Sequence, residues 1–232
     1  MPVFPRGLLA GPVVEAARSL VGARLLRLDD DGAVRLGRIV EVEAYAGEAD
    51  EASHARMGRT GRNAPMFGPP GHAYVYLVYG MYDCLNVVCE PPGTAAAVLV
   101  RAVEPLAGVE RMRAARLAHL EARRRDRAAE RRGADAARLA RLPAARLASG
   151  PGLVCAAFSV TRSADDGRDL CAGDGSLRLL AAADEAPPAR IVATPRIGIG
   201  YAGEPWRGLA WRFLDADSPA VSGSRPRQPG RG

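Results

Sequence analysis

Two acidic residues and a tyrosine alternate along one predicted strand of this chain, residues 34–45. Successive side chains of a strand point to opposite faces of the sheet. The faces of this strand are therefore Val40, Val42 and Ala44 on one side and Glu41, Glu43 and Tyr45 on the other. A carboxylate therefore lies beside an aromatic ring on one face of this strand. The alternative interpretation is a solvated strand face with two ordinary glutamates.

Tyrosines are concentrated a short distance further along the chain. The segment YVYLVYGMY contains Tyr74, Tyr76, Tyr79 and Tyr82. Tyrosines on strands usually serve packing, but a cluster at a turn is also suited to stacking against nucleic-acid bases. Tyr79 falls on the strand face opposite to that of Tyr76, because the two are an odd number of residues apart. It also precedes Gly80, which favours a side chain that projects from a hairpin tip. The alternative for Tyr79 is a ring packed under the turn.

Strands must position these residues. The predicted strands are 24–28, 34–45, 73–79, 84–89 and 95–103, followed by shorter ones at 177–180, 191–194, 196–199 and 211–214. The Asp-Asp-Asp-Gly run at 29–32 and the turn at 80–82 predict two hairpins. We expect 73–79, 84–89 and 95–103 to form the centre of the sheet.

Helices and a long loop account for most of the remaining chain. Helices are expected at 12–21 and 153–158, and also within 106–148, with interruptions at Gly133 and Pro143 and a mobile, arginine-rich middle. Residues 47–70 are polar and rich in Gly and Pro, so they predict a long surface loop, and such loops are usually functional. The mixture indicates the α+β class: a single compact domain with a largely antiparallel β-sheet and surrounding helices.

Positive charge is unevenly distributed. The net charge is +6, yet residues 111–146 contain twelve arginines and four acidic residues, and the tail from residue 224 adds three arginines. Concentrated positive charge suits a polyanionic partner such as DNA. A solvated Arg/Ala helix or a disordered insert explains the segment equally well. Charge therefore does not by itself establish DNA binding.

The sequence contains no lysine. An enzyme that attacks a sugar through a Schiff base needs an amine, usually a lysine or a free N-terminus. Any sugar chemistry in this protein should therefore use water as the nucleophile.

The cysteines and histidines do not form a metal-binding pattern. Cys84, Cys89, Cys155 and Cys171 have no CxxC spacing, and the three histidines are dispersed. We therefore expect reduced, mostly buried thiols, no metal and no cofactor. The N-terminus lacks the features of a signal peptide and no apolar run reaches the length of a membrane span, which predicts a cytoplasmic protein without a membrane partner.

Four blocks of sequence resemble successive motifs of the alkylpurine (3-methyladenine) DNA glycosylase family. They are GRIVEVEAYAGEADEASHARMGRTGRNAPMFGPPGHAYVYLVYGMYDCLNVV, AVLVRAVEPL, SGPGLVCAAFSV and TPRIGIGYAG. The blocks occur in the family's order and extend over most of residues 8–214. The Arg/Ala-rich segment at about 116–145 is similar to a variable region of the family, and it inherits no role from the resemblance.

The resemblance implies roles for eight residues. Glu43 would be the general base, with Arg101 and the backbone carbonyl of Ile197 holding the water. Tyr45, His54 and Tyr76 would line the pocket and sandwich a flipped base. Asn86 would exclude normal guanine, and Tyr79 would wedge into the space that the base leaves.

The resemblance also implies a function. It predicts a monofunctional DNA glycosylase that flips an alkylated or deaminated purine out of duplex DNA and hydrolyses its N-glycosidic bond in base-excision repair. We expect a monomer, with the glycosylase domain at 1–221 and a disordered basic tail at 222–232. Two other classes stay open: a damage sensor that binds without turnover, and an RNA- or nucleotide-binding protein that uses the basic segment.

Overall fold

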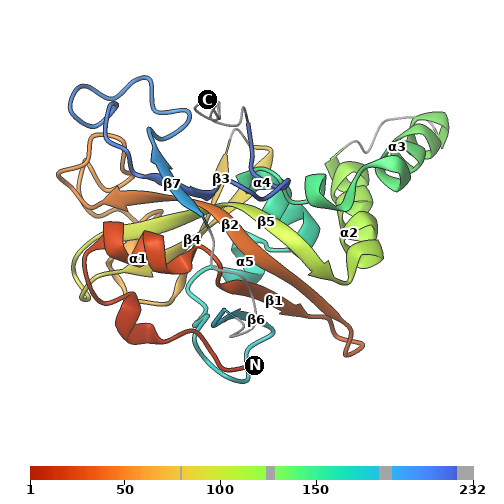
Figure 1. Cartoon of the computed structure of the whole chain (residues 1–232), viewed down its shortest axis with the longest axis horizontal. Helices are drawn as coiled ribbons and strands as arrows, with labels where there is room; N and C mark the ends of the chain where they lie inside the picture. Colours follow the sequence, from red (N-terminus) through yellow and green to blue (C-terminus); the bar gives the residue numbers. More distant parts are fainter. Residues whose placement is uncertain (79, 124–128, 183–189, 224–232) are drawn as a thin grey trace, which may run out of the picture.

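The computed structural model describes residues 1–78, 80–123, 129–182 and 190–223. Eight strands form one sheet in the order β3-β4-β5-β2-β1-β6, and β8 pairs with both β2 and β7. All of these strand pairs are antiparallel. Helices surround the sheet (Figure 1), which confirms the predicted α+β class.

The elements have the following bounds. The strands are β1 (Arg24–Leu28), β2 (Val34–Ala46), β3 (Ala73–Val78), β4 (Tyr82–Cys89), β5 (Ala96–Ala107), β6 (Leu177–Leu180), β7 (Ile191–Thr194) and β8 (Arg212–Asp215). The α-helices are α1 (Val13–Leu20), α2 (Val109–Arg123), α3 (Ala129–Arg141), α4 (Pro151–Phe158) and α5 (Arg162–Asp165). Short 3-10 turns are η1 (Arg6–Leu8), η2 (Ala64–Phe67) and η3 (Ala144–Arg146). Among the described residues, no helix is long and apolar enough to span a membrane.

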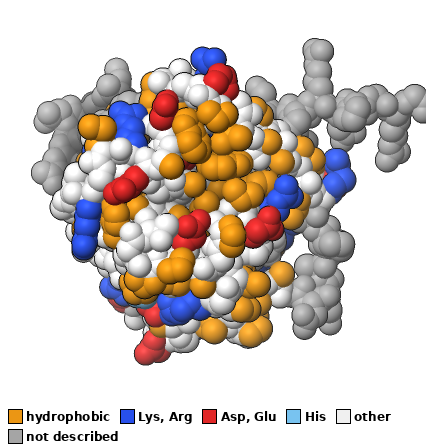
Figure 2. All heavy atoms as spheres, turned by 90° about the vertical axis from the view of Figure 1, so that its left-hand side faces the viewer, with side chains coloured by type: hydrophobic (Ala, Val, Ile, Leu, Met, Phe, Trp, Pro, Cys, Tyr) orange, Lys and Arg blue, Asp and Glu red, His pale blue; other side chains and the backbone are white. Residues whose placement is uncertain are grey.

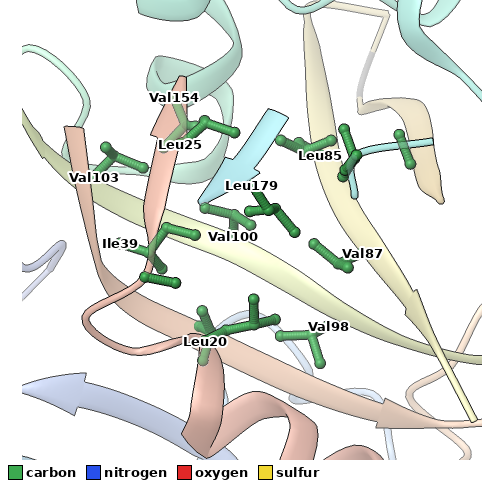
Figure 3. Close-up of a cluster of buried hydrophobic side chains, with 14 of the residues drawn as sticks. Leu20, Leu25, Ile39, Leu85, Val87, Val98, Val100, Val103, Val154 and Leu179 are labelled. Atoms are coloured by element: carbon green, nitrogen blue, oxygen red, sulfur yellow. The ribbon is translucent and has the colours of Figure 1, made fainter. Parts of the chain in front are cut away.

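One large core lies between the sheet and helices α1 and α4. Leu20 of α1 and Val154 of α4 both belong to it, together with Val98 and Val100 of β5 (Figure 3). Each fully buried side chain of this kind contributes about 1.5–3 kcal/mol. Alternation along β3 places Val75 in this core, so the neighbouring tyrosines of β3 face the opposite side of the sheet.

The pairing of β2 with β5 has three register shifts, and two of them lie beside the buried glutamates of β2. Ile39 pairs with Val103 and Glu41 pairs with Ala102, so Val40 is skipped on β2. Val42 then pairs with Val100, so Arg101 is skipped on β5. A bulge turns the following side chains relative to the sheet. Val40 therefore packs in a small separate cluster and not with Val42 and Ala44, contrary to the simple alternation that the sequence predicts.

Several other expectations require correction. β3 lies at one edge of the sheet and not at its centre, which β5 and β2 occupy. Gly133 lies within α3 and does not interrupt it. Residues 196–199 form no strand, because the backbone of Ile197 bonds to a side chain and Gly198 has φ +81°. The predicted mobile middle of 106–148 falls largely on 124–128, which lie outside the described residues.

The C-terminal part of the described chain is anchored in the fold. Ala220, Val221 and Ser222 are all buried, and Ser222 forms hydrogen bonds with Glu41. Ser222, which the sequence assigns to the tail, thus belongs to the folded domain. The remainder of the predicted tail, from residue 224, lies outside the described residues.

Candidate active site

A cavity of about 380 Å³ opens on the side of β3 that carries its tyrosines. Its walls come from strand β2 and the loop between β2 and β3, from strands β3, β4 and β5, and from the segment 197–201. Six of the eight site residues that the sequence predicts line this cavity: Tyr45, His54, Tyr76, Asn86, Arg101 and Ile197. Tyr79 lies outside the described residues, and Glu43 is fully buried.

Aromatic rings form one side of the cavity. The ring centroids of His54 and Tyr76 lie 4.3 Å apart in an edge-to-face arrangement, and those of Tyr74 and Tyr76 lie 5.4 Å apart. Tyr74 donates or accepts a 3.0 Å hydrogen bond with Nδ1 of His54. Tyr82 stacks instead on His119 of α2. The tyrosine cluster therefore divides, because Tyr82 contacts a helix and not the rings of the cavity.

His54 is held as a neutral ring. Burial lowers its pKa below the ordinary value, and the positive charges of Arg62 and Arg56 lower it further. A neutral imidazole does not repel a cationic ligand, whereas an imidazolium would. The aromatic wall can therefore accept a positively charged flat ring against its π-faces.

Glu43 lies beneath the cavity with no exposed surface. Its Oε2 accepts hydrogen bonds from the hydroxyl of Tyr45 at 2.9 Å and from Nη1 of Arg101 at 3.2 Å. Its Oε1 accepts the backbone N–H of Ile197 at 2.7 Å. The interpretation of a solvated strand face is therefore wrong. A carboxylate offers about four lone-pair sites, so these three donors leave one on Oε1 for a water.

The surroundings of Glu43 also fix the protonation of Tyr45. Burial and the nearby negative charge of Glu43 raise the pKa of Tyr45 well above its ordinary value. The phenol therefore stays protonated and donates its hydrogen bond to the carboxylate. The contact of Ile197 with Glu43 uses its N–H, whereas the resemblance assigns a water contact to its carbonyl.

Asn86 faces the cavity from β4 and is only 4% exposed. Its Nδ2 donates to the carbonyl of Tyr74 at 3.0 Å and to that of Cys84 at 3.5 Å. Because both partners are acceptors, the amide nitrogen is fixed toward the backbone. Asn86 therefore braces the hairpin and lines the cavity at the same time.

Sequence reasoning missed several lining residues. Arg62 donates to the carbonyl of Leu77 at 3.1 Å and lies 6.0 Å from the ring of Tyr76. Tyr201 also lines the cavity, and its hydroxyl donates to the carbonyl of Ala52. Both residues stand in quoted motif blocks, but neither shows a spacing pattern that would distinguish it from an ordinary loop residue.

The arginine-rich segment contains both structural and exposed side chains. Arg113 donates to the carbonyls of Leu139 and Leu142, and the buried Arg116 donates to that of Leu147. Helices α2 and α3 extend away from the sheet (Figure 1). Part of the basic segment thus serves folding. The face in Figure 2 is the side of the molecule away from α2 and α3, and on it basic and acidic side chains are interspersed among hydrophobic ones.

The thiols behave as predicted. Cys84, Cys89 and Cys155 are buried and Cys171 is half-buried, and all four are free. Burial raises the pKa of Cys84 to about 12, so this cavity-lining thiol is not a nucleophile at neutral pH. Within the described ranges, no group of three or more His, Cys, Asp or Glu residues is arranged to hold a metal ion.

A fixed carboxylate beneath an aromatic cavity is the arrangement of a hydrolase that accepts a flat ring. Comparison with known proteins specifies the class further, because residues 8–219 match the family model of methylpurine-DNA glycosylase. The chain belongs to this family, and it is accordingly a DNA glycosylase, a hydrolase of DNA repair.

Similar proteins of nearly the same length support this membership. A protein of Methanocella arvoryzae is 46% identical, with 97% of this chain and 98% of the relative covered. Proteins of Streptomyces avermitilis and Koribacter versatilis are 40% and 42% identical, covering 97% and 90% of this chain and 93% and 87% of theirs. The names of all three assign them as 3-methyladenine DNA glycosylases.

Proposed function

We propose that this enzyme removes alkylated or deaminated purines, of the 3-methyladenine, 7-methylguanine and hypoxanthine type, from duplex DNA. The observation that carries the proposal is the buried Glu43 carboxylate, fixed by Arg101, Tyr45 and Ile197 at the base of an aromatic cavity. The names of the relatives support 3-methyladenine as one of these substrates. A base stacked in a duplex cannot enter such a cavity, so the nucleotide must first be extruded.

Binding would use the aromatic wall. Tyr45, His54 and Tyr76 offer ring faces and edges to the extruded purine, and N3- or N7-methylation leaves that purine cationic. Tyr79 would occupy the space left in the duplex and so hold the flipped state. Extrusion costs a few kcal/mol, which stacking and hydrogen bonds in the cavity offset. A single copy of the chain suffices for one lesion, so we propose a monomer.

Hydrolysis would use a water on the remaining lone pair of Glu43. The bond between C1′ and the base breaks with its electron pair passing to the base, and the sugar gains oxocarbenium character. Water then bonds to C1′ and its proton passes to Glu43. A cationic methylpurine leaves as a neutral base, while a neutral lesion such as hypoxanthine also needs a proton from water or a protein donor.

A product assay on a panel of lesions tests the proposal. Duplexes with a single 3-methyladenine, 7-methylguanine, hypoxanthine or ethenoadenine are incubated with excess enzyme, and the free base is measured. Release of at least one of the first three is expected, with undamaged duplex and single-stranded RNA as controls. Tight lesion binding without release would favour the damage sensor, and preference for the RNA would favour the third class.

Trapping with borohydride tests the water nucleophile. Because the chain has no lysine, the product should be an intact abasic strand that breaks only on later alkali or heat. We expect no efficient covalent trapping. A robust protein–DNA adduct through a residue other than an N-terminal amine would overturn this mechanism.

Asn86→Ser tests the exclusion of guanine. Guanine differs from adenine and hypoxanthine by an amino group at C2, and stacking alone discriminates poorly between purines, so a steric clash must reject it. The shorter side chain should raise the release of normal guanine relative to hypoxanthine from matched duplexes. Loss of the bonds to Tyr74 and Cys84 should lower stability by about 1 kcal/mol. An unchanged ratio in a folded variant would remove Asn86 from this role.

A further inference from the structure

A second glutamate, Glu41, lies fully buried two residues before Glu43, and the proposed hydrolysis does not use it. Its Oε1 accepts Nε of Arg101 at 2.9 Å, Nε of Arg212 at 2.7 Å and the hydroxyl of Ser222 at 2.9 Å. Its Oε2 accepts the backbone N–H of Ser222 at 2.6 Å. Glu41 therefore joins β2 to β5, to β8 and to the chain that follows β8.

Arg101 is divided between the two glutamates. Its Nε bonds to Glu41, its Nη1 bonds to Oε2 of Glu43, and its Nη2 reaches the hydroxyl of Ser222 at 3.4 Å. A guanidinium otherwise prefers a two-pronged contact with one carboxylate. Because Glu41 and Ser222 hold two of its three nitrogens, Arg101 presents a single N–H to Glu43.

The four charged groups of this cluster balance. Two carboxylates, Glu41 and Glu43, face two guanidiniums, Arg101 and Arg212, and all four side chains are at most 9% exposed. If Glu41 lost its charge, the two cations would face Glu43 alone. Arg101 could then turn and occupy the lone pair of Glu43 that the attacking water requires.

We propose that Glu41, supported by Ser222, is a positioning residue that restricts Arg101 to one contact with Glu43 and so keeps the general base open to water. This inference rests on the proposed function. It also gives the C-terminal residues a role in the reaction, although Ser222 does not line the cavity.

Glu41→Gln is the direct test, measured as the single-turnover excision rate together with the dissociation constant for lesion duplex. The rate should fall by up to about 100-fold, as for a misplacement of about 1 Å, while the dissociation constant stays within a few-fold of the parent. A residue that only stabilised the fold would not slow the chemical step of fully folded, fully bound enzyme.

Two further variants keep the test decisive. Ser222→Ala removes one hydroxyl and should slow excision by about 2- to 10-fold without weakening lesion binding. Asp165→Asn removes the buried carboxylate of α5 that pairs with Arg27 of β1, outside the cavity, and should lower stability without slowing excision by the folded protein.

The outcomes separate the two proposals. If the parent releases no base, the proposed function fails. If the parent is active and Glu41→Gln keeps the parental rate, the positioning role alone is overturned. Should Glu41→Gln not fold, a parental excision rate in Ser222→Ala overturns it instead.

Discussion

Replacing Glu43 with glutamine should reduce single-turnover base excision by about 10²- to 10⁴-fold, the usual contribution of a general base. Glutamine keeps the shape of the side chain but cannot take a proton from water at neutral pH. The NH₂ group of the glutamine would also face another hydrogen-bond donor, either the backbone N–H of Ile197 or the hydroxyl of Tyr45. Lesion binding should largely survive, because the aromatic wall of the cavity is unchanged.

The control for Glu43→Gln is Glu104→Gln. Glu104 is also a glutamate of the sheet that pairs with an arginine, Arg38, but it lies outside the cavity. Glu104→Gln should excise at the parental rate. If Glu43→Gln does so as well, with enzyme in excess over lesion duplex, then Glu43 is not the base.

Asp50→Asn should destabilise the protein by about 3–5 kcal/mol, which is the cost of leaving one member of a buried ion pair without its partner. Asp50 and Arg196 have no exposed side-chain surface and are joined by two hydrogen bonds. Arg196 also donates to the carbonyl of Ala44 and lies 4.7 Å from the centre of the Tyr45 ring. The unpaired cation would therefore loosen the segment that carries Ile197.

Denaturant unfolding measures the effect of Asp50→Asn. The double variant Asp50→Asn, Arg196→Met should recover part of the lost stability, because it removes the uncompensated charge. Asp217→Asn, in the exposed pair with Arg190, should leave the unfolding midpoint unchanged. A midpoint for Asp50→Asn equal to that of the parent would show that this pair does not stabilise the fold.

The sequence predicts the parts of the fold that depend on local patterns. Alternating residues and turn chemistry correctly indicate the two hairpins, and α1, α4, β6 and β7 fall close to their expected positions. The helix at Gly133 shows the limit of such reasoning. A single exposed glycine costs about 1 kcal/mol, which the alanine-rich surroundings in α3 tolerate.

The features that the sequence did not reveal depend on contacts between distant segments. The bulges at Val40 and Arg101 arise where β2 meets β5, and they set the direction of the Arg101 side chain. Ile197 bonds to Glu43 across 154 positions, and Ser222 bonds to Glu41 across 181. Residue types in one segment do not encode such pairings, so the residues of the site were predictable but their hydrogen bonds were not.

The most direct test of the central claim is the stoichiometry of products from a duplex that contains one hypoxanthine. Free base and alkali-labile strand are measured together in a single turnover, with Glu43→Gln in parallel. We expect one free base for each abasic strand, with the strand intact before alkali, and near-complete loss of both products in the variant. Absence of free base with the parent enzyme, or strand cleavage before alkali, would contradict the account.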